Sequence, residues 1–199
     1  MKIKLMRRLP RLAAMTVAGA IALLVVSPPA EARKNRAMYT VDGELLMPNK
    51  YRQWIFIGAP VTPNDMNNGK AAFPEFHHVY INPAGFASYK KTGTFRDGTV
   101  IVKELVTVGG KSAASGNGYF PGEFIGVAAA VKDGKRFGKE PGHWAYFSFM
   151  GEGGTTMTSA VAQPAAACNA CHQQNAREDW VFTQFYPALR GAKNAKPAQ

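Results

Sequence analysis

The sequence predicts an α+β fold that is mainly an antiparallel β-sheet with a few helices. Residues 99–108 form the clearest strand, because they are rich in β-branched side chains and contain neither glycine nor proline. A loop rich in Gly, Ser and Asn over 109–122 joins this strand to a second apolar run over 123–132, which favours a hairpin. Apolar side chains at helical spacing near the C-terminus indicate that a helix follows the sheet.

The other elements follow from local signals. Aromatic and β-branched side chains predict further strands over 76–82 and 143–150. The short apolar run at 52–58 fits either a strand or the end of a helix. Pro83 begins a short helix over 84–91, and Gly93 ends it. Residues 61–72, which carry Pro, Asn and Gly, and residues 133–142 are predicted loops. Residues 33–46 form a charged lead-in, and the small and polar residues 151–163 form a linker.

Near the C-terminus, one apolar helix face is predicted. Phe182, Phe185, Tyr186 and Leu189 recur at i, i+3, i+4 and i+7. Pro187 should bend or end the last turn of this helix, because proline lacks an amide hydrogen. We expect residues 191–199 to be a disordered tail.

The first 32 residues have the composition of a secretory signal peptide. Five basic residues precede an apolar stretch over 12–26, and residues 30–32 form an A-x-A cleavage site. A membrane anchor is the weaker alternative, because this stretch is shorter than the roughly 20 residues that span a bilayer. The paired arginines lack the rest of a twin-arginine signal. We therefore expect general secretion, cleavage after Ala32 and a periplasmic location.

The expected mature chain, residues 33–199, has the size of a single domain. Removing 32 of the 199 residues leaves 167, which is enough to bury a core without disulfide bonds. The removed segment holds five of the 24 basic and one of the 13 acidic residues, so the formal charge falls from +11 to +7. This charge suits an acidic electron-transfer partner, and it also fits ordinary solubility. Nucleic acid is not an expected partner, because the basic residues are spread along the chain.

The most informative motif is C-x-x-C-H at 168–172, which contains the only two cysteines of the chain. Two thiols at this spacing can each add to a vinyl group of haem, and the adjacent histidine can bind the iron. The motif predicts one haem c per chain on a C-terminal helix, attached through Cys168 and Cys171, with His172 as proximal ligand. Export agrees with this chemistry, because bacteria attach c-type haem outside the cytoplasm. The alternatives are a disulfide, a zinc site that lacks a second ligand pair, and a thioredoxin-like dithiol.

Beyond the motif, the chain resembles the cytochrome P460 family. Four segments carry the resemblance: 43–71, 86–109, 115–126 and 168–190. It implies a periplasmic mono-haem protein with a β-sheet fold, usually dimeric, whose five-coordinate iron has an open distal side. Enzymes of this type oxidise hydroxylamine to nitrous oxide or nitric oxide, whereas the related β-sheet cytochromes c′ bind nitric oxide or carbon monoxide.

The same resemblance implies that Lys103 is covalently bonded to a meso carbon of the porphyrin. Lys103 stands in the middle of the best predicted strand. A buried strand interior is unfavourable for an ammonium group, and bonding the amine to carbon would remove that cost. The alternative is a lysine on the solvent face of an edge strand.

Ala128 occupies the position where enzymes of the family carry a distal glutamate that accepts protons. If the two strands of the predicted hairpin pair about the centre of the 109–122 loop, Lys103 lies opposite Ala128 on the same face. A one-residue slip would break this arrangement. Glu104 should face the other way, and Glu123 lies five residues before Ala128, so neither is expected to replace the missing acid.

Two further distal candidates lie on the 76–82 strand. His77 stands where relatives can carry an arginine, and it could carry protons near neutral pH. Phe76 is the candidate steric cap of the haem. Since adjacent strand residues point in opposite directions, one of His77 and His78 should face solvent. His143, beside a tryptophan, is expected to be structural.

Together these features predict a periplasmic enzyme that oxidises hydroxylamine and passes electrons to a soluble cytochrome, with turnover weakened by Ala128. The alternative is a nitric oxide-binding protein of the cytochrome c′-β type, which an apolar distal pocket would favour. Simple electron transfer ranks last, because it requires two axial ligands and no methionine stands in a suitable context. A homodimer is expected, without a membrane anchor after signal cleavage.

Overall fold

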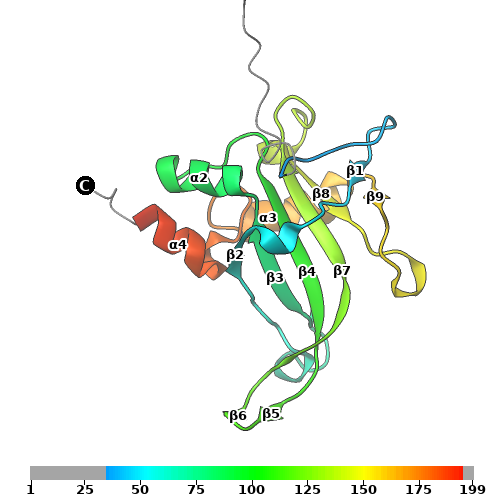
Figure 1. Cartoon of the computed structure of the whole chain (residues 1–199), viewed down its shortest axis with the longest axis vertical. Coiled ribbons are helices and arrows are strands. Elements are labelled where there is room, and N and C mark those ends of the chain that lie inside the picture. Colours follow the sequence, from blue (N-terminus) through cyan, green and yellow to red (C-terminus); the bar gives the residue numbers. More distant parts are fainter. Residues whose placement is uncertain (1–34, 195–199) are drawn as a thin grey trace, which may run out of the picture.

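The computed structural model describes residues 35–194, which are built around a five-stranded antiparallel sheet (Figure 1). The strands lie in the order β2-β3-β4-β7-β8. Their bounds are Ile55–Gly58 (β2), Phe76–Ile81 (β3), Val100–Val108 (β4), Pro121–Lys132 (β7) and Trp144–Ser148 (β8). The predicted mainly antiparallel α+β fold is confirmed. The predicted signal peptide lies outside the described residues.

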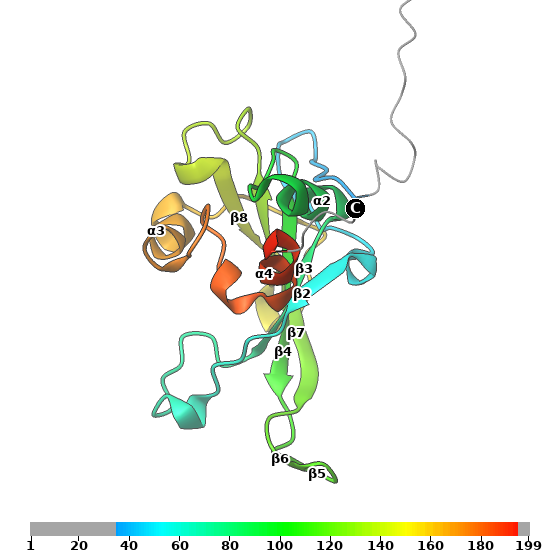
Figure 2. The same ribbon diagram turned by 90° about the vertical axis from the view of Figure 1, so that its left-hand side faces the viewer.

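Two small sheets accompany the main one. β1 (Leu45–Leu46) pairs with β9 (Ser159–Ala160), and β5 (Ser112–Ala113) pairs with β6 (Gly116–Asn117). The second pair lies inside the segment predicted as a loop, and it extends the β4–β7 hairpin away from the helices (Figure 2). In the described part of the chain, five short 3-10 helices lie in the connections: η1 (Tyr51–Gln53), η2 (Asn64–Met66), η3 (Pro141–His143), η4 (Glu152–Gly154) and η5 (Thr183–Phe185).

The helix predicted after Pro83 is α2, Pro83–Thr92. It begins with Asn82, whose side-chain Oδ1 accepts a hydrogen bond from the amide of Gly85. It ends at Gly93, whose φ of 72° is the left-handed conformation that glycine adopts without a steric cost. Asn82 Oδ1 also accepts from the amide of Val100, so the cap joins α2 to the start of β4.

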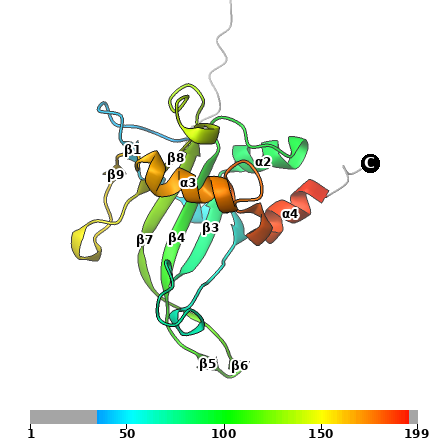
Figure 3. The same cartoon turned by 180° about the vertical axis from the view of Figure 1, so that it is seen from behind.

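Alternation along the strands divides the core between the two faces of the sheet. One face packs Val100, Val102 and Phe147 against η1 and β1. The other face packs Val79 and Tyr146 beneath two helices, α3 (Ala165–Asn175) and α4 (Pro187–Asn194). Figure 3 shows α3 crossing this second face. No helix of residues 35–194 is long and apolar enough to cross a membrane.

The prediction for the C-terminal helix is wrong in its position. Pro187 begins α4 and does not end a helix, because proline at the first helical position loses no hydrogen bond. Tyr186, with φ −111° and ψ 94°, is extended, as the residue before a proline prefers to be. Residues 191–194 continue α4 and are not the predicted disordered tail, while 195–199 lie outside the described residues.

Candidate functional site

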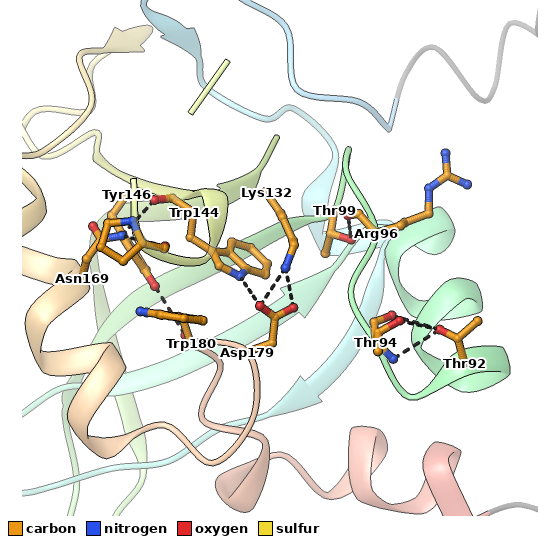
Figure 4. Close-up of polar contacts among 11 residues, drawn as sticks. Thr92, Thr94, Arg96, Thr99, Lys132, Trp144, Tyr146, Asn169, Asp179 and Trp180 are labelled. Atoms are coloured by element: carbon orange, nitrogen blue, oxygen red, sulfur yellow. Dashed lines mark hydrogen bonds and ion pairs between the residues drawn. The ribbon is translucent and has the colours of Figure 1, made fainter. Parts of the chain in front are cut away.

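α3 carries the whole C-x-x-C-H motif, and one residue inside the motif anchors it. Asn169 is only 2% exposed. Its Nδ2 donates a hydrogen bond of 2.9 Å to the carbonyl of Trp144 on β8 and a longer one of 3.4 Å to the carbonyl of Pro141 (Figure 4). Because both carbonyls belong to the framework around the sheet, Asn169 fixes α3 against the second face. The sequence reasoning missed this role, since the two middle residues of the motif carry no chemistry of their own.

His172 is held on three sides. Its Nδ1 lies 2.8 Å from the carbonyl oxygen of Trp180, and because a carbonyl only accepts, Nδ1 carries the proton. The ring packs between Tyr146 and Phe182, at 4.4 and 4.7 Å between ring centroids. Burial lowers the pKa of His172; the Trp180 hydrogen bond opposes this effect and the charge of Lys103 adds to it. The imidazole is therefore neutral, with Nε2 as the nitrogen left to bind a metal.

The two cysteines are free thiols in this structure, so the disulfide alternative finds no support. Cys168 is half-buried and Cys171 is exposed. Together with His172 they lie three and four residues apart, which brings the three side chains to one side of α3. Within residues 35–194, no group of three or more His, Cys, Asp or Glu side chains could hold a metal ion, so a zinc site has no ligand set there.

The register predicted between the two long strands is confirmed. Lys103 on β4 pairs with Ala128 on β7, and Ala128 pairs in turn with Ser148 on β8. Val79 on β3 lies on the other side of Lys103. Directly opposite residues project from the same face of a sheet, so these four side chains form a row on one face. That face is the one beneath α3, since Val79 belongs to the core cluster that also contacts Cys168.

Lys103 lies on a central strand, so the alternative of an edge-strand lysine is wrong. Its Nζ lies 4.7 Å above the ring of Phe73. Burial lowers the pKa of Lys103, while Glu75 and Cys168 oppose the shift. A lowered pKa increases the fraction of neutral amine, which is the form that can attack carbon. Lys103 thus lies on the sheet face beneath the helix that carries the C-x-x-C-H motif, in a partly desolvated position.

His77 is on the same face as Lys103, because it lies opposite Leu105, two residues along β4. Its Nε2 is buried and has no hydrogen-bond partner within the described residues. Burial, and then the charge of Lys103, lower the pKa of His77 to about 4. The side chain is therefore neutral at physiological pH, and its buried Nε2 remains without a hydrogen-bond partner among the described residues.

The structure contradicts the prediction that Phe76 is the steric cap of the haem. Phe76 immediately precedes His77 in a regular strand and pairs with Val106, so it projects from the opposite face and cannot cap a haem beneath α3. The aromatic ring near Lys103 and His77 is instead Phe73, whose centroid lies 6.0 Å from that of His77. Phe73 precedes β3 in an irregular segment, where strand periodicity gives no signal.

The second histidine of the pair also differs from expectation. His78 projects from the face opposite to His77, but its side chain is only 21% exposed. Its Nδ1 lies 3.6 Å from a carboxylate oxygen of Glu104. Glu104 faces away from Lys103, as predicted, and is bound by the Tyr51 hydroxyl and by Arg52 Nε at 2.7 Å. This acid is a structural group of the other core and is not available to the site.

A different acid, Glu75, was missed by the sequence reasoning. One of its carboxylate oxygens is buried and has no hydrogen-bond partner within the described residues. Its charge raises the pKa of Lys103, which places the carboxylate within electrostatic range of that lysine. Glu123, in contrast, is exposed at the start of β7. Extending the β3 alternation back two residues from His77 was the only signal that could have identified Glu75.

The arrangement therefore gathers a thiol-bearing helix, a neutral imidazole and a partly desolvated lysine around one sheet face. A family model described as "Cytochrome P460" matches residues 48–183, which is more than half of the chain. No curated protein matches the chain.

Proposed function

The chain belongs to the cytochrome P460 family, which implies a haem cofactor with its iron, and we propose that it is a periplasmic hydroxylamine oxidoreductase with one c-type haem. Cys168 and Cys171 would attach the haem, His172 would bind its iron, and Lys103 would be bonded to the porphyrin. One observation carries this proposal: Lys103 projects from the sheet face that lies beneath α3, the helix that bears the C-x-x-C-H motif.

The side chains present fit a haem. The two thiols are free, and the Nδ1 of His172 is occupied by a carbonyl, which leaves Nε2 for the iron. Buried atoms of Glu75 and His77 lack partners within the described residues, which is uncommon for polar atoms unless a ligand or solvent completes the site. When bound, the haem supplies an iron that can hold the nitrogen of hydroxylamine and accept its electrons.

The protein's own contribution on the distal side is proton transfer, because hydroxylamine loses protons as well as electrons. His77 is neutral and can accept a proton at Nε2. A base with a pKa of about 4 is a weak acceptor at neutral pH, and Ala128 accepts none. We therefore propose slow turnover. The electrons would leave to a soluble cytochrome, and the protein would act as an exported homodimer, cleaved after about Ala32.

Intact mass and the ferrous absorption spectrum test this proposal. We expect the purified protein to have the mass of residues 33–199 plus one haem, with a strongly red-shifted ferrous band. In Lys103→Met the two cysteines should still retain the haem, and the red shift should disappear because the ring loses its nitrogen substituent. Lys111→Met is the matched control, since Lys111 is an exposed lysine that pairs with Asp65. A red-shifted band that survives in Lys103→Met would exclude the cross-link.

The second candidate is nitric oxide binding without turnover. The row that contains Lys103 also contains Val79 and Ala128, which offer no proton acceptor. An apolar distal side retains a small neutral ligand without promoting proton removal. Steady-state oxidation of hydroxylamine separates the two functions: a haem-loaded protein that binds nitric oxide and shows no oxidation above free haem would support this candidate.

A further inference from the structure

Asp179 and Trp180 form an unusual turn between α3 and η5. Their φ angles are 45° and 59°, in the left-handed region that side chains other than glycine rarely adopt. Such a backbone conformation is strained, and it persists only where its surroundings hold it. Two in succession require an explanation from the contacts around them.

The carboxylate of Asp179 is bound from β7 and β8 (Figure 4). Lys132 Nζ lies 2.7 and 2.6 Å from its two oxygens. The indole Nε1 of Trp144 donates a third hydrogen bond of 3.3 Å. The side chains of Lys132 and Asp179 are only 14% and 25% exposed, and Trp144 is fully buried, so solvent screens this ion pair less than one on the open surface.

The turn determines the position of the Trp180 carbonyl group, which contacts the proximal side of the site. The Trp180 carbonyl oxygen accepts the Nδ1 hydrogen bond of His172, and the hydroxyl of Tyr146 reaches the same oxygen at 3.3 Å. On its far side, the Trp180 ring packs so closely on Gly142 that a Cβ there would lie 2.4 Å from a ring carbon. The turn is therefore held by the Lys132–Asp179 ion pair on one side and by the close packing of Trp180 on Gly142 on the other.

We propose that the Lys132–Asp179 ion pair is a positioning device for the proximal ligand. It holds the strained turn so that the Trp180 carbonyl stays on Nδ1 of His172. That hydrogen bond sets the ring orientation and the donor strength of Nε2 toward iron, because partners of the second nitrogen tune a ligating histidine. The inference rests on the proposed function in one respect, namely that His172 is the axial ligand.

Asp179→Asn is the central test. Asparagine tolerates the left-handed region and keeps the shape of the side chain, but it removes the charge that Lys132 binds. Lys132→Met breaks the same ion pair by removing its positive partner. In the haem-loaded ferrous protein we expect both variants to lower the iron–histidine stretching frequency in resonance Raman spectra. The midpoint potential should rise, because a weaker donor stabilises ferric iron less.

Two further variants separate positioning from stability. Lys193→Gln breaks the ion pair of Lys193 with Glu178, the neighbour of Asp179 in the chain, and should leave frequency and potential at the wild-type values. Asp179→Gly relieves the backbone strain and removes the charge, so thermal stability should be retained better than in Asp179→Asn while the frequency still falls.

The outcomes are distinct. If the iron–histidine band of Asp179→Asn and of Lys132→Met stays at the wild-type frequency, the positioning role is overturned and the proposed function is left intact. A fall in melting temperature with an unshifted band would likewise reduce the ion pair to a structural role. A wild-type protein that carries haem without an iron–histidine band would refute the ligand assignment itself, and the inference with it.

Discussion

His77 should make the folded protein sensitive to mild acid. Burial, together with the charge of Lys103, lowers its pKa from 6.5 to about 4. In the unfolded chain the same imidazole takes up a proton near pH 6.5, so the unfolded state binds more protons between these two values. The contribution of His77 to stability is therefore complete above about pH 6.5, declines as the pH falls, and is lost below about pH 4.

The size of this effect follows from the difference between the two pKa values. It corresponds to at most about 3 kcal/mol in the free energy of unfolding. His77 is only half-buried, and a Lys103 bonded to the porphyrin would no longer add its charge, so burial alone would remain as the cause of the shift. We therefore expect a smaller loss, of about 1–2 kcal/mol, between pH 7 and pH 4.5.

Urea unfolding of the haem-loaded protein across this pH range, followed by circular dichroism, measures the loss. His77→Gln should reduce the slope of stability against pH, because the group that titrates is gone. His78→Gln is the matched control, since it changes the adjacent histidine on the opposite face and leaves His77 in place. Equal losses between pH 7 and pH 4.5 in wild type and His77→Gln would refute the reasoning.

Two further changes test the site and its framework. Ala128→Glu puts a carboxylate opposite Lys103 and should raise hydroxylamine turnover by about 100-fold in steady-state assays. Ala128→Gln is the control and should not raise it. A wild-type protein that already turns over fast and gains nothing from the glutamate would contradict this expectation. Asn82→Ala removes four hydrogen bonds from a fully buried side chain and should lower the urea-derived stability by about 3 kcal/mol. A loss below about 1 kcal/mol would show that water replaces those bonds.

The sheet and its register could be predicted because the signals were local and strong. β4 and β7 are long, adjacent in sequence and joined by a loop rich in turn residues, so pairing about the loop centre had few alternatives. The prediction that Lys103 faces Ala128 followed from that pairing alone. The prediction of a haem cofactor rested on the spacing of residues 168–172 and on the family resemblance, and the family match supports it; attachment through the two cysteines stays a prediction.

The distal side was harder, because its residues come from an irregular segment. Phe73 and Glu75 both precede β3. The β3 alternation extended back by two residues points to Glu75, but no periodicity indicates which way the side chain of Phe73 points. Phe76 and His77 could not both line the haem, since neighbours in a strand project from opposite faces. Pro187 was ambiguous for a different reason: proline ends helices in their interior and begins them at the first position, and the sequence alone does not say which applies.

The two sides of the site differ in how fully their polar groups are satisfied, and this difference bears on what limits the reaction. On the proximal side, His172 Nδ1 is paired, its ring is packed between two aromatic rings, and the turn that supplies its partner is held by an ion pair. On the distal side, buried atoms of His77 and Glu75 have no partner within the described residues. The proposed iron ligand is thus fixed while the candidate proton acceptors are not, so a distal acid at position 128 should raise turnover without moving the iron–histidine frequency. A glutamate variant that gained activity only together with a shifted frequency would place the limitation on the proximal side instead.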